Sequence, residues 1–288
     1  MGSPSTTRYA LSKRDQAFRD RYGPVAMVTG ASDGIGREFA RTLAARGLDL
    51  ILVARRAERL EALAAEVRAA HGIAVTVVAA DLAEPESVQT VLADTAGHDI
   101  GLFVAAAGFG TSGPFVDQPV GPELDMIDVN CRAVVAMTHP IGKRFVRRGR
   151  GGIVLLSSLV GFQGVPRAAN YAASKAFIQS LAEGLRTELK PLGVDVVSAA
   201  PGPIASGFAA RANMHMGMSQ PPTVVAKETL DALGRKTTVR PGWLVKVLEA
   251  GLMVLPRWGR VLVMTQVMKG MARGASTDTE PDGQHAQA

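Results

Sequence analysis

Six short apolar runs, each rich in β-branched residues, alternate with segments of helical periodicity along most of this chain. Strands that are apolar on both faces are typical of a parallel sheet covered by helices on each side. The runs are VAMVTG (25–30), LDLILVAR (48–55), AVTVVAAD (74–81), IGLFVAAAG (100–108), GGIVLLSS (151–158) and VDVVSAAPG (194–202). Between the second and third runs, Leu60, Leu63, Ala64 and Val67 recur at helical spacing. The alternation predicts an α/β fold with a single, doubly wound parallel sheet, and RVLVM (260–264) is predicted as a late strand.

The chain has 288 residues, of which 47% are hydrophobic, and this is enough for one large α/β domain. The sequence shows neither internal repeats nor an interdomain linker. We therefore predict one domain over residues 23–273, with a substrate-side segment at 203–273. Residues 1–22 are predicted to be an N-terminal extension, and the polar segment 274–288 is predicted to be disordered.

The first predicted strand leads into a glycine-rich turn, VTGASDGIGRE (28–38). Ligands of doubly wound sheets bind beyond the carboxyl ends of the strands. Glycine permits a tight turn close to a pyrophosphate, and the following helix N-terminus supplies free N–H groups and a positive dipole. The turn is therefore predicted to bind a dinucleotide. The residues assigned to this contact are Gly30, Ser32, Asp33, Gly34, Ile35 and Gly36.

The end of the second strand distinguishes NAD from NADP. An NAD site has a carboxylate here that binds the adenosine ribose, whereas this chain has Ala54 followed by Arg55. A guanidinium holds a 2′-phosphate by charge-assisted bonds worth roughly 1.5–3 kcal/mol, on the order of tenfold to hundredfold in affinity. We therefore predict NADP(H) as the cofactor. In the alternative interpretation, Arg55, Arg56 and Arg59 only decorate an exposed helix start.

Asp81 and Leu82 follow the third strand, at the same edge of the sheet. The Asp81 carboxylate would accept a hydrogen bond from the adenine amino group, or it would cap a helix that begins near Glu84. The sequence leaves these two interpretations open.

The stretch NYAASKAF (170–177) places Tyr171 and Lys175 four residues apart, on one face of a helix. On this spacing alone they are either two neighbours or a proton donor and the group that tunes it. Other kinds of site are disfavoured. The chain has one cysteine, Cys131, expected to be a buried apolar side chain, and its five histidines are scattered, so we expect no metal. The net charge of +6 is dispersed, so we expect no nucleic acid.

Taken together, these residues resemble the short-chain dehydrogenase/reductase family from about residue 22 to 208. The matching pieces are TGASDGIG (29–36), Asp81–Leu82, AAAG (105–108), Asn130, SS (157–158), Tyr171 with Lys175, and PGPIAS (201–206). The flanking RYGPVAMVTGASDGIG and ARRAERLEAL are similar to the branch that contains long-chain 3-oxoacyl-CoA and 17β-hydroxysteroid reductases and bacterial relatives. The resemblance implies a Rossmann-like sheet and an NAD(P)-dependent oxidoreductase that acts on CH–OH and C=O groups.

The resemblance also assigns four catalytic residues. Ser158 would hydrogen-bond the substrate carbonyl oxygen, and Tyr171 would donate the proton. Lys175 would hold the nicotinamide ribose and lower the pKa of the tyrosine, while Asn130 would anchor a water that relays protons. Asn130, Tyr171 and Lys175 are also expected to contact the cofactor. An ammonium about 4 Å away supplies roughly 4 kcal/mol at an effective dielectric of ~20, enough to bring a phenol of pKa ~10 close to neutrality.

Further cofactor contacts are implied for PGPIAS. Pro201 and Gly202 would shape a turn beneath the nicotinamide, and the Ile204 N–H would meet its carboxamide. Ser206 stands where the family usually has threonine, and it keeps the hydroxyl.

The turn after the fourth strand departs from the family pattern. Ala107 and Gly108 are expected to contact the cofactor, but Ala105 and Ala106 stand where asparagines are usual. Alanine cannot make the side-chain bonds of those asparagines, so only the backbone remains for holding adenosine or the central strand.

The substrate side is less regular. Phe109, Phe162 and Phe208 are expected to wall the substrate pocket, or else to belong to the core. ANMHMGMSQPPTV (212–224) is either a lid over a bulky apolar substrate or an ordinary loop. The apolar and basic segment 243–273 is not expected to span a membrane. It is interpreted as core and subunit packing, with contact to a membrane surface as the alternative.

We predict an NADPH-dependent carbonyl reductase that acts on an apolar ketone. The alternatives are an NADP-dependent alcohol or hydroxysteroid dehydrogenase that runs oxidatively, and a non-catalytic nucleotide-binding regulator. A homodimer or homotetramer is expected, because in the family the helices that carry Val135 and Phe177 pair across a two-fold axis. The N-terminus lacks the apolar core of a signal peptide, so the location is predicted to be cytoplasmic or peripheral to a membrane.

Overall fold

The structure, a computed structural model, describes residues 11–205, 207 and 219–276. Within this part of the chain, seven parallel strands form one sheet in the order β3-β2-β1-β4-β5-β6-β7. The strands are β1 (Val25–Thr29), β2 (Asp49–Ala54), β3 (Val75–Ala79), β4 (Ile100–Ala105), β5 (Gly151–Leu156), β6 (Val194–Ala199) and β7 (Thr238–Val239). The predicted doubly wound sheet is confirmed, and β1 to β6 all fall within the six apolar runs. The strand order reverses between β1 and β4, where Thr29 is paired with Ala105.

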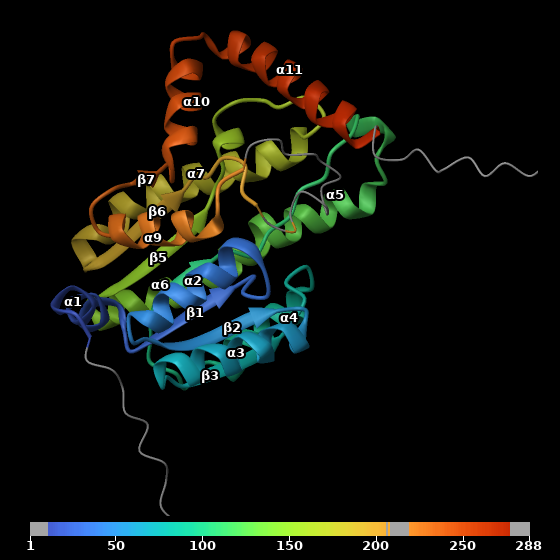
Figure 1. The fold of residues 1–288 in the computed structure, drawn as a ribbon. Helices are drawn as coiled ribbons and strands as arrows, with labels where there is room; N and C mark the ends of the chain where they lie inside the picture. Colours follow the sequence, from blue (N-terminus) through green and yellow to red (C-terminus); the bar gives the residue numbers. More distant parts are fainter. Residues whose placement is uncertain (1–10, 206, 208–218, 277–288) are drawn as a thin grey trace, which may run out of the picture.

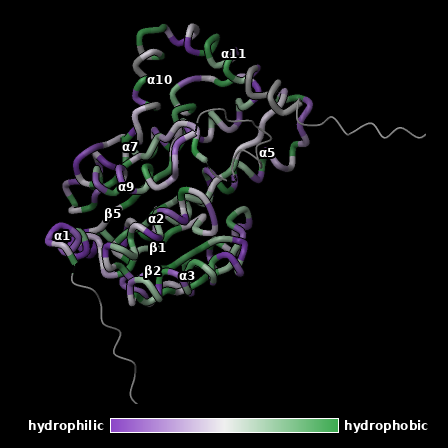
Figure 2. Tube along the Cα trace, viewed as in Figure 1, coloured by the Kyte–Doolittle hydropathy of each residue, from purple (hydrophilic) through white to green (hydrophobic). Residues whose placement is uncertain are grey.

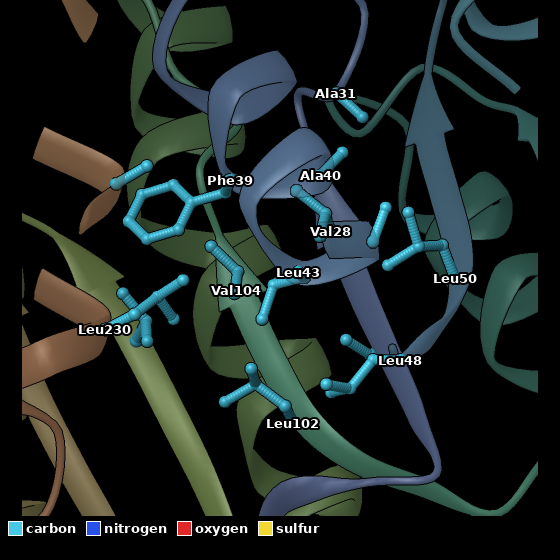
Figure 3. Packing of buried hydrophobic residues seen from close by; sticks show 14 of the residues in the cluster. Val28, Ala31, Phe39, Ala40, Leu43, Leu48, Leu50, Leu102, Val104 and Leu230 are labelled. Carbon is cyan, nitrogen blue, oxygen red and sulfur yellow. The ribbon is translucent and has the colours of Figure 1, made fainter. Parts of the chain in front are cut away.

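Helices cover both faces of this sheet (Figure 1). One face carries α2 (Gly34–Ala45), α3 (Ala57–His71) and α9 (Pro222–Ala232), and the other carries α4 (Pro85–Asp94), α6 (Ala133–Arg148) and α7 (Ala169–Leu189). Alternate strand residues enter the two cores, so that Val28 joins the α2 side and Met27 joins the α6 side. Figure 3 shows Phe39 and Leu43 of α2 packed over Val104 of β4.

α1 (Lys13–Tyr22) lies in the expected N-terminal extension and is mostly hydrophilic (Figure 2). It is nevertheless fixed to the sheet. The Tyr22 hydroxyl and Arg21 Nε each donate a hydrogen bond of 2.8 Å to the buried Asp195 carboxylate, at the amino end of β6. The domain limits at residues 23 and 273 stay a prediction.

The prediction of a late strand at 260–264 is wrong, because these residues lie inside helix α11 (Arg257–Ser276). The last strand of the described sheet is instead the two-residue β7, which pairs with β6. A short apolar run fits a strand or a buried helix equally well by periodicity. Here the buried positions are Met264 and Met268, which are four residues apart and therefore share one helix face.

α10 (Trp243–Met253) rises away from the sheet, and α11 crosses above it towards α5 (Val120–Ile127) (Figure 1). Among the described residues, no helix is both long and apolar enough to cross a membrane. Of the segment 274–288, which was expected to be disordered, residues 274–276 continue α11 and the others lie outside the described residues. Residues 212–218 of the methionine-rich stretch also lie outside them, and residues 222–224 begin α9.

Candidate active site

A cavity of about 970 Å³ lies at the carboxyl ends of the strands. Turns after β1 to β6 form its inner wall, and residues of α10 and α11 form its outer wall. The predicted site residues on this wall are Gly30, Ser32, Asp33, Gly34, Ile35, Gly36, Arg55, Asp81, Leu82, Ala107, Gly108, Phe109, Ser158, Tyr171, Lys175, Pro201, Gly202 and Ile204. Ser206 and Phe208 lie outside the described residues.

The glycine-rich turn is packed too closely for side chains at two of its positions. Gly30 has a φ of 68°, and a Cβ there would lie 2.7 Å from the Ala107 nitrogen. A Cβ on Gly36 would lie 2.3 Å from the Gly30 carbonyl oxygen. Asp33 is the N-cap of α2, and its carboxylate accepts a hydrogen bond of 2.7 Å from the Gly34 N–H. The turn therefore holds the N-terminus of α2 against the cavity.

Three arginines surround the end of the cavity that borders β2. Arg55 lies 3.4 Å from the Asp81 carboxylate, while Arg56 and Arg59 lie 3.5 and 3.3 Å from the Asp33 carboxylate. Arg56 also donates a hydrogen bond of 3.1 Å to the Ser32 hydroxyl. All three side chains are half-exposed, and all three line the cavity. They therefore lie at an exposed helix start and also face the cavity.

Asp81 does not cap the following helix. The N-cap of α4 is Glu84, and the Asp81 carboxylate instead accepts a hydrogen bond of 3.1 Å from the Ala83 N–H. The helix begins one residue after Glu84, at Pro85, so the Asp81 side chain closes a turn before it. Asp81 remains on the cavity wall beside Arg55.

Thr29, at the end of β1, contacts the turn after β4 and was not among the predicted site residues. Its hydroxyl accepts a hydrogen bond of 3.1 Å from the Ala107 N–H and lies 3.5 Å from the Val104 carbonyl. The turn after β4 is thereby tied to the end of β1. The one feature of the sequence that could have identified Thr29 is that it is a hydroxyl side chain at the end of an otherwise apolar strand.

Asn130 lies behind the cavity wall, in a π-helical turn (Asp128–Arg132) between α5 and α6. Its side chain donates to the Phe109 carbonyl at 2.9 Å and accepts from the Phe109 N–H at 3.1 Å. It also donates to the Ser174 hydroxyl at 3.0 Å, and Ser174 in turn donates to the Tyr171 carbonyl at 2.8 Å. Asn130 thus connects the turn after β4 to the helix turn that carries Tyr171. Its role in a water relay stays a prediction.

Ser158, Tyr171 and Lys175 come together where β5 and β6 end. Ser158 follows β5, and its hydroxyl lies 3.4 Å from the Pro201 carbonyl oxygen after β6. Tyr171 and Lys175 occupy successive turns of α7, with the Lys175 ammonium 5.7 Å from the centre of the tyrosine ring. Lys175 Nζ donates a hydrogen bond of 2.9 Å to the Leu156 carbonyl.

That Lys175 lowers the pKa of Tyr171 stays a prediction, because burial is the main cause of the pKa changes of both side chains. Burial raises the pKa of the Tyr171 hydroxyl to about 12, and a hydrogen bond with Ser158 offsets only part of that rise. Burial also lowers the pKa of Lys175 to about 8, against a smaller opposing effect of Cys131. Burial therefore disfavours the charged form of each side chain. The Lys175 ammonium is directed at the Leu156 carbonyl.

Two of the three phenylalanines can be placed. Phe109 lies on the cavity wall, and its contact with substrate stays a prediction. Phe162 does not line the cavity; the Arg240 guanidinium lies 4.7 Å above its ring. The pattern of an aromatic after a strand could not separate these two environments.

The substrate end of the cavity is walled by the C-terminal helices. Met264 and Met268 of α11 pack in a small cluster with Val165 and Ala172, and Tyr171 lies against this cluster. Val245 of α10 packs against Gly202, in the turn after β6. A Cβ on Gly202 would lie only 2.7 Å from a methyl group of Val245. The cavity is therefore apolar where it approaches the tyrosine.

Among the residues that the structure describes, no group of three His, Cys, Asp or Glu side chains could hold a metal ion. Cys131 is buried, and burial raises the pKa of its thiol.

Comparison with known proteins gives one family. The family model described as short chain dehydrogenase matches residues 24–217. A 7beta-hydroxysteroid dehydrogenase of Collinsella aerofaciens is 34% identical over 179 residues, which cover 62% of this chain and 68% of that protein. A very-long-chain 3-oxoacyl-CoA reductase of Pyrenophora tritici-repentis is 37% identical over 180 residues, which cover 60% of this chain and 53% of that protein. The chain thus spans about half the length of that reductase.

Solved structures agree. A structure that describes the stereoselectivity of a 7beta-hydroxysteroid dehydrogenase superposes with a TM-score of 0.80 and 28% identity, covering 86% of this chain and 98% of the other. A short-chain dehydrogenase from Sphingobium yanoikuyae in complex with NADPH superposes with a TM-score of 0.74 and 31% identity, covering 92% and 99%.

Proposed function

This chain belongs to the short-chain dehydrogenase/reductase family, and on that premise we propose that it is an NADPH-dependent carbonyl reductase acting on an apolar ketone. The resemblance to this family is confirmed. Family membership itself makes the chain an oxidoreductase that acts on hydroxyl or carbonyl groups. The preference for NADP, the direction and the kind of ketone are the parts that we propose.

One observation carries the proposal. A single cavity has Arg55, Arg56 and Arg59 at one end and the Ser158, Tyr171 and Lys175 side chains at the other. Arginine binds phosphate by charge-assisted and often bidentate hydrogen bonds, and the α2 N-terminus between the two ends suits a pyrophosphate. The residues present therefore fit an NADP molecule that reaches from the arginines to the tyrosine.

The bound dinucleotide would supply the hydride, and this chain would supply the proton. Ser158 and Tyr171 would hydrogen-bond the substrate carbonyl oxygen and stabilise the negative charge that develops on it. With a pKa of about 12, the Tyr171 hydroxyl keeps its proton near neutral pH and is ready to donate it. An alkoxide is a stronger base than a phenolate, so the transfer from Tyr171 is favourable.

The same pKa supports the reductive direction. Oxidation of an alcohol needs a base in place of an acid, and a phenol of pKa about 12 is a poor base near neutral pH because it remains protonated. The oxidative alternative therefore predicts a rate that rises with pH. The cavity walls that α10 and α11 form are apolar, and this favours an apolar substrate.

The test is to follow the oxidation of NADPH, and in parallel of NADH, with a series of ketones of increasing size and apolar surface. We expect turnover with NADPH, at least about tenfold weaker use of NADH, and lower KM for the larger apolar ketones. Tight NADPH binding without turnover of any ketone or alcohol would favour the nucleotide-binding regulator instead.

We further propose a homodimer or homotetramer in the cytoplasm. Val135 on α6 and Phe177 on α7 are large apolar side chains that remain exposed on the face away from the sheet. Light scattering at micromolar concentration checks the assembly, and a monomer would contradict it.

A further inference from the structure

The helices α10 and α11 carry an exposed apolar surface that the proposed reaction does not use. We call it the hairpin face and define it as Trp243, Val254, Trp258 and Leu262. Both tryptophans of the chain belong to it, and each is 69% exposed; Val254 is 82% exposed. None of the four lines the cavity, so this exposure is on the outside of the molecule. Figure 2 shows hydrophobic stretches interleaved with hydrophilic ones along both helices.

The charges that α11 contributes to the hairpin face are positive. Arg257 and Lys269 are exposed on α11, and the sequence of α11 contains neither Asp nor Glu. On α10, Lys246 lies 3.4 Å from Glu228 and is already paired. A surface that combines tryptophan, aliphatic side chains and unopposed cations on α11 suits an apolar partner with negative charge at its boundary.

The hairpin face is continuous with the cavity. Val247, one helical turn after Trp243, lines the cavity and remains exposed. Val263, next to Leu262, and Val267, one turn further, do the same. These valines share the cavity wall with Met264 and Met268, and Tyr171 packs against the cluster that these methionines form.

We propose that the hairpin face docks on a lipid bilayer with anionic headgroups, and that apolar ketones enter the cavity from this bilayer. Tryptophan prefers the interface between hydrocarbon and headgroups. Each cation near an anionic surface adds about 1 kcal/mol, or about fivefold in affinity. A second copy of this chain is a poorer occupant, because a two-fold contact would bring together two copies of a surface on which Arg257 and Lys269 carry the same positive charge. Docking does not depend on the proposed function, whereas the loading of ketones rests on it.

The first experiment measures docking alone. The full chain is sedimented with vesicles of phosphatidylcholine, with and without about one third phosphatidylserine. We expect binding to the anionic vesicles that weakens as salt is raised. Trp243→Ser with Trp258→Ser should lower it at least about tenfold, and Arg257→Glu with Lys269→Glu should abolish the preference for anionic lipid. Leu192→Ser, which changes an exposed apolar residue at the amino edge of the sheet, should leave it unchanged.

Thermal unfolding and NADPH titration confirm that each variant is folded. The proposal would be overturned if the unmutated protein does not bind vesicles. It would also be overturned if the tryptophan variant binds them as well as the unmutated protein does. A change of oligomeric state in that variant without any vesicle binding would overturn it too, since the occupant would then be a second copy.

The second experiment tests loading. The tryptophan variant should show a KM raised at least about fivefold for a ketone dissolved in vesicles and an unchanged KM for a short water-soluble ketone. An unchanged KM for both would contradict loading from the bilayer. If vesicles bind normally and no ketone is reduced at all, the proposed function fails while docking stands.

Discussion

Burial controls both titratable groups of the Tyr171–Lys175 pair. It raises the pKa of the phenol to about 12 and lowers the pKa of the ammonium to about 8, so each group favours its neutral form. The side chains are nevertheless held in place by polar contacts, since Lys175 donates to the Leu156 carbonyl and Tyr171 is hydrogen-bonded with Ser158. The pair is thus costly for folding and suited to proton transfer.

Tyr171→Phe removes one hydroxyl and should leave α7, Lys175 and the cavity in place. NADPH should still bind, while ketone reduction falls by about two to four orders of magnitude because the alkoxide loses its proton donor. Lys175→Ala should lower both turnover and NADPH affinity, since that side chain is proposed to hold the nicotinamide ribose. Cofactor titration beside steady-state rates checks both variants. Near-normal turnover of Tyr171→Phe would mean that another residue supplies the proton.

The lowered pKa of Lys175 predicts a pH-dependent stability. Below pH 8 both the folded and unfolded states hold this proton, and the folded state pays for a buried ammonium. Between about 8 and 10.5 only the unfolded state keeps the proton, so stability rises with pH as the penalty is relieved. Lys175→Met should therefore be more stable than the parent by up to about 3 kcal/mol near pH 7, a difference that shrinks towards pH 10.

Denaturant unfolding of the parent and Lys175→Met across this range provides the measurement. Lys190→Met, at an exposed lysine just after α7, is the matched control and should show no such trend. A stability difference that stays constant with pH would contradict the assigned burial penalty.

The elements differ in how far the sequence predicts them. β1 to β6 can be predicted from the sequence, because strands buried on both faces of a parallel sheet are short, apolar and rich in β-branched residues. The glycine-rich turn can also be predicted, because Gly30 and Gly36 have no room for a Cβ and both positions therefore require glycine. The prediction of a strand at 260–264 fails because Met264 and Met268 are buried on one face of α11. Val261, Leu262 and Val263 beside them remain exposed or half-exposed.

The same reasoning explains what was missed in the site. Thr29 acts through a hydrogen bond to a residue 78 positions away, which no local pattern contains. The pKa of Tyr171 depends on how deeply α7 is covered, and part of that cover is the cluster of Met264 and Met268 on α11. Spacing identified the pair, but only the fold gives the direction of its pKa changes.

The turn between β2 and α3 is the element that should select NADP. Arg55→Asp should lower the preference for NADPH over NADH by about tenfold to hundredfold, because it removes a phosphate ligand and adds a carboxylate. Arg147→Asp makes the same change in charge at the exposed C-terminal end of α6 and should have no effect. Steady-state kinetics with both cofactors check this. If the unmutated protein uses NADPH and NADH equally, the assignment fails.

At the scale of the whole molecule, the two edges of the sheet have different tasks. The carboxyl edge carries the cavity, where the titratable side chains of Tyr171 and Lys175 are buried. The amino edge carries a polar clamp, in which the Asp195 carboxylate accepts hydrogen bonds from Arg21 and Tyr22 of α1. Burial raises the pKa of the Tyr22 hydroxyl, and the hydrogen bond to the Asp195 carboxylate and its charge raise it further, so the phenol stays protonated and keeps donating.

Asp195→Ala should therefore destabilise the protein without changing its chemistry. It leaves the buried Tyr22 hydroxyl without this acceptor, and it releases Arg21, which is half-exposed and can be rehydrated. We expect a loss of about 2–3 kcal/mol in the free energy of unfolding, and about 1 kcal/mol for Tyr22→Phe, which removes only one hydrogen bond. Below the unfolding transition, kcat and the KM for NADPH should match the parent. Denaturant unfolding and kinetics on the same preparations check this, and a fall in kcat with unchanged stability would show that the amino edge contributes to the reaction.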